Sequence, residues 1–365
     1  MPRPTLLALV LFLPLLLSAP LWATRLPEER EDLVRAIDDL AERERIEQKI
    51  PGLSVAVVRG EETLLAKGFG LADVELEVPA TAATVYRIGS VTKQFTAAAI
   101  LQLREDGKLE LEDPITSYLT GLPERTQDVT IRHLLNHTSG IPSYTDLGDE
   151  WAVKRRLDLT HDELIALFKE RPFNFAPGEK QLYNNSGYYL LGVIIEKVSG
   201  KSYAEYLREN IFEPLGMKST CYGSEAVIIR NRAQGYRLVD GELQNDDFLS
   251  MNQPFAAGAL VSTVTDLVIW MRALVDARVV SDESYELMTA PTVLKDGTSH
   301  NYGFGLSLDP LLDRPCVSHG GGINGFRSHL VYLPDEDLVI AVLANCETAS
   351  PDRIAARIAR RLAGG

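Results

Sequence analysis

The pattern of apolar and polar positions near the start of the chain predicts a helix followed by a hairpin. Leu33, Ile37 and Leu40 recur at helical spacing inside a charged stretch, which is typical of an amphipathic helix. The apolar runs 54–59 and 63–69 come next, separated by Gly-Glu-Glu. Two strand-like runs joined by so short a turn predict a β-hairpin.

The pattern then changes to helices and loops, and strand-like runs return after about residue 300. These runs are 302–308, 316–319, 326–333 and 338–344. A last helix is predicted from about Asp352. Strands at both ends predict an α/β fold of the α+β type, with an antiparallel sheet flanked by terminal helices and an inserted, mainly helical lobe. The α/β lobe is expected at about 24–90 and 295–365, and the helical lobe at about 91–294.

The first 23 residues predict a signal peptide. Arg3 precedes an apolar core at 6–17, and small residues at 18–23 suit cleavage. An uncleaved membrane anchor is the alternative, but the apolar stretch is short for a span and is interrupted by Pro14. We therefore expect an exported protein, periplasmic or secreted, whose mature chain begins at about residue 24 and has no membrane span.

Composition narrows the classes of partner. The 51 acidic and 37 basic residues give a formal net charge of −14, which argues against nucleic-acid binding and against anionic membranes. Three cysteines are too few for a disulfide scaffold or a zinc cluster, and no metal or cofactor is expected. Cys316 and Cys346 form either one disulfide or two buried free thiols. Composition gives no indication of the oligomeric state.

Candidate chemistry begins at Ser90, three residues before Lys93, where a loop turns into a predicted helix that runs to about Glu105. This spacing places the hydroxyl and the amine on one helix face, the arrangement of a Ser–Lys nucleophile. The alternative is that Ser90 caps the helix. A capping box would need Glu or Gln where Lys93 stands, and a cation in the first turn opposes the helix dipole by about 0.3–1 kcal/mol. That position favours the neutral amine, which can accept a proton.

Two more motifs follow in chain order. Tyr183-Asn184-Asn185 lies between a turn and a helical run, and His319-Gly320-Gly321-Gly322 follows a short apolar stretch. Each alone has a structural alternative: a buried tyrosine, an asparagine turn or cap, or a plain glycine loop. A phosphate-binding loop is not indicated, because its glycines would lead into a helix with a Lys-Ser/Thr pair.

Taken together, the three motifs resemble those of the penicillin-recognising serine hydrolases. Within that family the chain is similar to the branch of class C β-lactamases, D-Ala-D-Ala carboxypeptidases and esterases. The segments His133–Pro142, Pro214–Met217 and Gly325-Phe326 add to the resemblance, which covers about residues 48–347. It implies a β-lactamase/transpeptidase-like fold, with a ligand cleft between two lobes.

The resemblance implies a catalytic group of three side chains. Ser90 would be the nucleophile that forms an acyl-enzyme, and Lys93 and Tyr183 the proton machinery, with either of them as the first base. An adjacent ammonium is expected to stabilise the Tyr183 phenolate. No metalloprotease helix is predicted, because His133 and His137 lack the glutamate between them. They are predicted to fix the loop at 138–140.

The resemblance also implies a substrate-binding group. Asn185 would hydrogen-bond Lys93 and the amide carbonyl of the substrate. His319 would face the leaving group or a substrate carboxylate, and Gly321 would allow close backbone approach. The backbone N–H groups of Ser90 and Gly322 would form the oxyanion hole.

The third motif limits the choice of substrate. Class C β-lactamases carry Lys-Thr-Gly where this chain has His319-Gly320-Gly321, and a mostly neutral histidine holds a carboxylate less strongly than lysine does. We therefore predict a serine hydrolase of the D-alanyl carboxypeptidase or esterase type, acting on an amide, a D-amino-acid-containing peptide or an ester. The alternatives are a β-lactamase and a non-catalytic penicillin-binding or cell-wall-peptide sensor domain.

Overall fold

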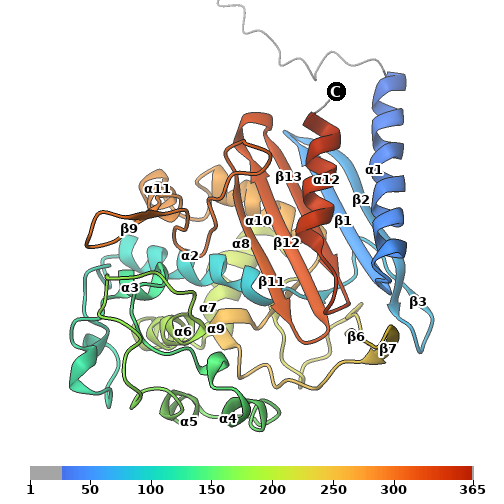
Figure 1. Cartoon of the computed structure of the whole chain (residues 1–365). Coiled ribbons are helices and arrows are strands. Elements are labelled where there is room, and N and C mark those ends of the chain that lie inside the picture. Colours follow the sequence, from blue (N-terminus) through green and yellow to red (C-terminus); the bar gives the residue numbers. More distant parts are fainter. Residues whose placement is uncertain (1–26, 364–365) are drawn as a thin grey trace, which may run out of the picture.

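The structure, a computed structural model, describes residues 27–363. The predicted signal peptide lies outside the described residues. The central element is a six-stranded antiparallel sheet in the order β11-β12-β13-β1-β2-β3 (Figure 1). Its strands are β1 (Gly52–Arg59), β2 (Glu62–Asp73), β3 (Val78–Pro79), β11 (Val317–Ile323), β12 (Phe326–Leu333) and β13 (Leu338–Ala344).

Helices cover both faces of this sheet. The terminal helices α1 (Pro27–Glu47) and α12 (Pro351–Ala363) lie side by side on one face (Figure 1). On the other face α10 (Val264–Val275) packs against β1 and β13. β1 and β13 are therefore buried along their whole length, which explains why they consist of nearly continuous apolar residues.

The predicted elements of the α/β part are largely confirmed. Leu33, Ile37 and Leu40 are buried on α1, and the 54–59 and 63–69 runs lie in the β1–β2 hairpin. The strands predicted at 326–333 and 338–344 have the bounds of β12 and β13. The limits of the two lobes stay a prediction. Within the segment 91–294, which we expected to form the helical lobe, α10 packs against the sheet.

Helices, short strands and loops build the rest of the molecule, and the two longest of these helices are α2 and α6. The α-helices are α2 (Thr92–Glu105), α3 (Ile131–Leu135), α4 (Asp149–Ala152), α5 (His161–Ala166), α6 (Asn185–Ser199), α7 (Tyr203–Leu207), α8 (Glu213–Leu215), α9 (Phe255–Gly258) and α11 (Asp282–Met288). The minor strands are β4 (Tyr86–Arg87), β5 (Cys221–Tyr222), β6 (Tyr236–Val239), β7 (Glu242–Asn245), β8 (Leu260–Ser262), β9 (Thr292–Val293) and β10 (Ser299–His300). The shorter helical turns are η2 (Gly89–Val91), η3 (Ile115–Ser117), η4 (Glu124–Thr126), η5 (Tyr144–Asp146), η6 (Arg208–Phe212) and η7 (Pro334–Glu336).

Helix α2 is the axis of this part. It contacts α6, α7 and α9, and its residues from Thr92 to Leu101 are all buried. Phe95 stacks on Trp270 of α10 with ring centroids 3.9 Å apart. Because α10 also packs on the sheet, this stack joins the start of α2 to the sheet core.

Two sequence expectations are corrected or decided by the structure. The run 302–308 is not a strand: it makes only isolated bridges, Tyr302 with Ser307 and Ser307 with Ser318. Gly305 has a φ of +68°, which bends the chain where a strand would continue. Cys316 and Cys346 are buried free thiols. None of the helices within residues 27–363 is both long and apolar enough to cross a bilayer.

Candidate active site

Ser90 lies in the tight turn η2, directly before α2. It does not cap this helix, because the N-cap residue is Val91 and no side chain makes a capping hydrogen bond there. The preceding Gly89 has a φ of +49°, and a Cβ there would lie 2.9 Å from the backbone nitrogen of Gly322. A glycine is therefore needed at 89 both for its backbone angle and for the close approach of the edge strand β11.

Lys93 is fully buried on the first turn of α2, and its amine reaches three oxygen atoms. Nζ donates to Asn185 Oδ1 at 2.8 Å and to the carbonyl of Ala257 in α9 at 2.8 Å. Ser90 Oγ lies 3.2 Å away. Burial without a carboxylate partner lowers the pKa of Lys93 well below its usual value. Burial therefore favours the neutral form of this amine.

Tyr183 completes this group from the loop before α6. Lys93 Nζ lies 4.7 Å from the centroid of its ring, and the Ser90 hydroxyl is near enough to the Tyr183 hydroxyl to lower its pKa. The residue is 41 % exposed overall, yet burial raises the pKa of its hydroxyl, and the nearby Ser90 hydroxyl lowers that pKa by less. Burial therefore works against the expected phenolate, because it disfavours the charged form of both groups.

The two asparagines after Tyr183 have different tasks. Asn184 is the N-cap of α6, and its Oδ1 accepts from the Gly187 N–H at 2.7 Å. Asn185 instead turns toward α2, where Oδ1 accepts from Lys93. Its Nδ2 donates to Thr145 Oγ1 at 3.0 Å. The start of α6 therefore orients the amide that holds Lys93.

The glycine run lies inside β11, the edge strand, rather than in a loop. A Cβ on Gly321 would lie 2.0 Å from the Ile88 carbonyl oxygen and 2.2 Å from Ser328 Oγ. The close approach implied for Gly321 is thus to the turn that carries Ser90. Ser328 Oγ donates to the same Ile88 oxygen at 2.8 Å, which fastens the turn to the sheet.

His319 is buried and both of its ring nitrogens have partners inside the protein. Nδ1 lies 2.6 Å from the carbonyl oxygen of Gly320, and Nε2 lies 3.0 Å from the hydroxyl of Tyr302. Burial, with Lys93 nearby, lowers the pKa of His319 to about 3. The residue is neutral at physiological pH.

Sequence reasoning missed three parts of this site. The Ala257 carbonyl could not be predicted from the sequence, because every residue has a backbone carbonyl. The sequence pattern predicts a strand at Tyr302, and the structure has none there. His137, predicted to fix a loop, lies against Tyr183 with ring centroids 4.4 Å apart; its position two residues before Ser139-Gly140 in the family-like segment was the available signal.

A small cavity of about 110 Å³ opens beside Ser90. Its lining comes from segments far apart in the sequence: Gly89, Ser90, Tyr144, Thr145, Trp151, Asn185, Leu249, Pro254, Ala257, Gly258, Gly322, Ile323 and Asn324. None of these described residues carries a formal charge. The cavity therefore suits a small neutral group attached to a carbonyl held at Ser90.

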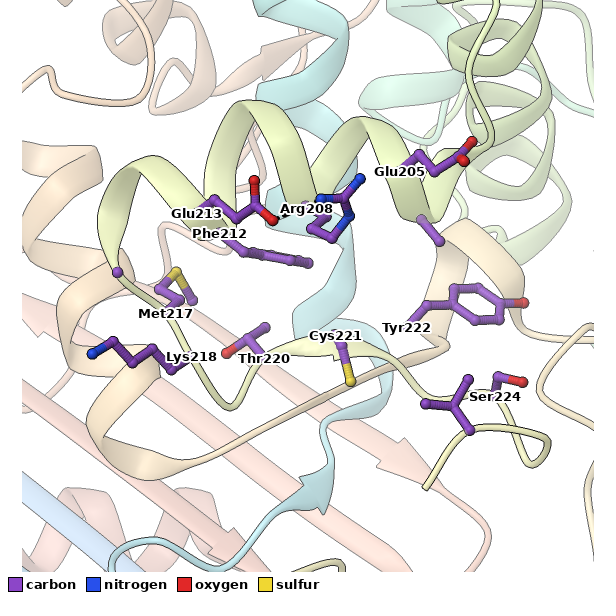
Figure 2. A pocket seen from close by; sticks show the side chains of 13 residues that line it. Glu205, Arg208, Phe212, Glu213, Met217, Lys218, Thr220, Cys221, Tyr222 and Ser224 are labelled. Atoms are coloured by element: carbon purple, nitrogen blue, oxygen red, sulfur yellow. Dashed lines mark hydrogen bonds and ion pairs between the residues drawn. The ribbon is translucent and has the colours of Figure 1, made fainter. Parts of the chain in front are cut away.

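A larger cavity of about 620 Å³ lies elsewhere, between the α7–α8 region and the segment that includes β5 (Figure 2). Phe212 and Met217 contribute apolar surface, and Cys221 is also among the lining residues (Figure 2). Burial raises the pKa of that thiol, so it is not an activated nucleophile. Because no residue of the Ser90 group lines this cavity, the smaller one is the candidate active site.

Known proteins are similar in sequence to most of this chain. The D-aminopeptidase of Gluconobacter oxydans (strain 621H) is 30% identical over 313 residues, 82% of this chain and 57% of that protein. Penicillin-binding protein 4* of Bacillus subtilis (strain 168) is 32% identical over 308 residues, 80% of this chain and 68% of that protein. The chain thus spans little more than half the length of the D-aminopeptidase.

Solved structures match over most of their length. A D-amino acid amidase from Ochrobactrum anthropi SV3, complexed with L-phenylalanine amide, has a TM-score of 0.81 at 28% identity and covers 91% of this chain and 99% of its own. The octameric penicillin-binding protein homologue from Pyrococcus abyssi has a TM-score of 0.80 at 34% identity, covering 91% and 77%. The predicted fold class is confirmed. A family profile described as β-lactamase matches residues 32–365, and this chain belongs to the β-lactamase family.

Proposed function

We propose that the protein is a serine hydrolase that forms an acyl-enzyme through Ser90 and acts on an amide, a D-amino-acid-containing peptide or an ester. One observation carries the proposal: the buried Lys93 amine has two carbonyl acceptors and one hydroxyl partner. A neutral amine has two protons and one lone pair. If the protons go to Asn185 and Ala257, the lone pair faces Ser90 Oγ.

Acylation follows from this arrangement. Ser90 Oγ attacks the substrate carbonyl carbon, and its proton passes to Lys93 Nζ, which becomes an ammonium. The negative charge that develops on the carbonyl oxygen is stabilised by the backbone N–H groups of Ser90 and Gly322. The close packing of Gly89 on Gly322 keeps these two backbone segments together.

Tyr183 supports the proton transfers that remain. Its neutral hydroxyl donates a proton to the departing amine or alkoxide, and the Lys93 ammonium replaces that proton. The products of this stage are a serine ester, the free leaving group and a neutral Lys93. Water then attacks the ester with the same groups acting in reverse, and Ser90 is regenerated.

The His319 side of the site favours substrates without a carboxylate there. Both imidazole nitrogens are engaged within the protein, and the ring is neutral. The cavity near Ser90 is small and its described lining is uncharged. The D-aminopeptidase and D-amino acid amidase relatives support amides as substrates over carboxypeptidase substrates, which end in a free carboxylate.

The nucleophile is tested by covalent labelling. Intact-mass spectrometry after a fluorophosphonate probe should show one adduct on the wild-type protein and none on Ser90→Ala. Ser328→Ala is the matched control, because Ser328 Oγ also lies in the region but bonds to the Ile88 carbonyl; it should still be labelled. An adduct that persists on Ser90→Ala would place the nucleophile elsewhere.

The β-lactamase and sensor alternatives are separated from this proposal by turnover. A panel of p-nitrophenyl esters, D-amino-acid anilides, D-alanyl dipeptides and nitrocefin should give steady hydrolysis of the neutral esters and anilides. Faster hydrolysis of nitrocefin than of any ester would favour a β-lactamase. A single stoichiometric burst with every compound would favour a penicillin-binding or cell-wall-peptide sensor.

We also propose that the chain is exported.

A further inference from the structure

The Tyr302 hydroxyl lies between two imidazole rings. It is 3.1 Å from His137 Nε2 and 3.0 Å from His319 Nε2. His137 comes from the segment after α3, Tyr302 from the irregular segment after β10, and His319 from the edge strand β11. One hydroxyl thus joins three separate parts of the chain beside the catalytic group.

The outer partners of the two rings fix where each proton lies. The Asn184 backbone N–H donates to His137 Nδ1 at 3.1 Å, so this nitrogen carries the lone pair and Nε2 carries the proton. The Gly320 carbonyl can only accept, so His319 Nδ1, 2.6 Å away, carries the proton. His319 Nε2 therefore carries a lone pair.

These assignments leave one direction for the chain of hydrogen bonds. His137 Nε2–H donates to the Tyr302 oxygen, and the Tyr302 O–H donates to His319 Nε2. The Nε2 lone pair of His319 is then occupied, and the ring has no N–H left for a substrate. Reversal would require His137 to lose its Nε2 proton, but the backbone N–H of Asn184 blocks the other tautomer.

The other titratable groups around the rings do not oppose this state. Lys93 from α2 faces both imidazoles, and Tyr183 lies 6.1 Å from His319 between ring centroids. Tyr188 from α6 donates its hydroxyl proton to the Leu135 carbonyl at 2.7 Å, and His329 from β12 lies near His319. None of these groups is a carboxylate, so none would stabilise an imidazolium.

We propose that Tyr302 is a positioning residue that holds His319 in the Nδ1–H tautomer with its Nε2 lone pair engaged, so that the site discriminates against substrates with a carboxylate at this position. The proposal rests on the proposed function only in assuming that His319 faces the substrate bound at Ser90. The choice between substrates with and without a carboxylate then depends on the Tyr302 hydroxyl, which need not touch the substrate.

The first test is spectroscopic and needs no turnover. Long-range ¹H–¹⁵N spectra of the full chain labelled with ¹⁵N-histidine identify the protonated nitrogen of each ring. His319→Gln and His137→Gln assign the signals by loss. We expect protonation at Nδ1 of His319 and at Nε2 of His137 in the wild-type protein. A proton on Nε2 of His319 would overturn the proposal, whatever the enzyme's activity.

The second test measures binding without chemistry. Benzylpenicillin and its methyl ester form a matched pair with and without a carboxylate, and calorimetry on the Ser90→Ala background gives both dissociation constants. Adding Tyr302→Phe frees His319 Nε2 to take a proton. We expect the preference for the acid over the ester to rise at least about tenfold at pH 5.5 and less at pH 8, as for a hydrogen bond to a charged group.

A control separates positioning from general damage. Tyr206→Phe removes another buried hydroxyl, which bonds Gln102 at 3.4 Å in the second half of α2, and it should leave the ratio unchanged. Loss of affinity for both ligands alike in Tyr302→Phe, or an unchanged ratio, would overturn the proposal. Failure of Ser90 labelling in the wild-type protein would overturn the proposed function while leaving the tautomers and the binding ratio intact.

Discussion

At the residue scale, Lys93 and Tyr183 form one proton-transfer unit around Ser90. Lys93→Ala and Tyr183→Phe should each lower kcat about 10²–10⁴-fold, the usual contribution of a positioned acid or base. Because both act on the same proton, the double variant should lose little more than the worse single one. The measurement is kcat on a p-nitrophenyl ester for all four proteins. If the kcat loss of the double variant equals the product of the two single losses, Lys93 and Tyr183 do not share one proton-transfer path.

Buried histidines give the fold a predictable pH dependence. Burial lowers the pKa of His133, His137, His319 and His329, whereas an unfolded histidine titrates near pH ~6.5. Below that pH the unfolded chain binds more protons than the native one. The stabilisation is thus complete above pH ~6.5 and is lost as the pH falls, for His319 down to its folded pKa of about 3.

Urea unfolding at pH 7.5 and pH 5 tests this dependence. The free energy of unfolding should fall between the two values, and the fall should be smaller in His319→Gln by at most about 2 kcal/mol, since each pH unit contributes at most about 1.4 kcal/mol per group. His300→Gln, at a partly exposed position in β10, is the control. Equal falls in wild type and His319→Gln would contradict a buried neutral imidazole.

At the scale of elements, the edge strand must lie close against the Ser90 turn. Gly321→Ala would place a Cβ 2.0 Å from the Ile88 oxygen, so β11 and the turn must separate. We expect a loss of about 1–3 kcal/mol in unfolding free energy and a kcat/KM loss of roughly 10²-fold from the displaced oxyanion hole.

Gly320→Ala is the matched control for that substitution. Its Cβ would meet His329 Nδ1 at 3.3 Å and no backbone atom closer than 3.8 Å. The activity of this variant should stay within about threefold of wild type. Equal activity losses in the two variants would show that the strand tolerates no side chain at all, and that the contact with Ile88 is not the cause.

Much of the fold was predictable at this scale, and so was part of the site. β12 and β13 were predicted with their full bounds because their apolar runs end at turn residues. Ser90 and Lys93 were predicted because they stand three residues apart where a helix begins, and this spacing places them on one face. Tyr302 and the Ala257 carbonyl were not, because their positions depend on contacts between α9, β11 and segments distant in sequence. The pKa shifts of Lys93 and Tyr183 also depend on burial, which the local sequence does not reveal.

At the scale of the whole molecule, the fold has two apolar cores on opposite faces of the sheet. Alternate residues of one strand divide between them: Val342 belongs to the core under α1 and α12, and Leu343 to the core shared with α2 and α10. The candidate active site is built on the second core. Stability and catalysis can therefore be altered separately.

Glu44 tests that separation. It is fully buried on α1 and is paired with Arg353 and Arg357 of α12. Glu44→Gln should lower the unfolding free energy by about 1–2 kcal/mol, less than for a fully buried pair, because both arginines are nearly half exposed and stay hydrated. Ester kcat/KM at 25 °C should stay within about twofold, because the helices cover the face away from Ser90. Asp39→Asn, at an exposed position of α1, should change the unfolding free energy by no more than ~0.5 kcal/mol. Its ester kcat/KM should also stay within about twofold of wild type. A large loss of activity in folded Glu44→Gln would show that the two faces of the sheet are coupled.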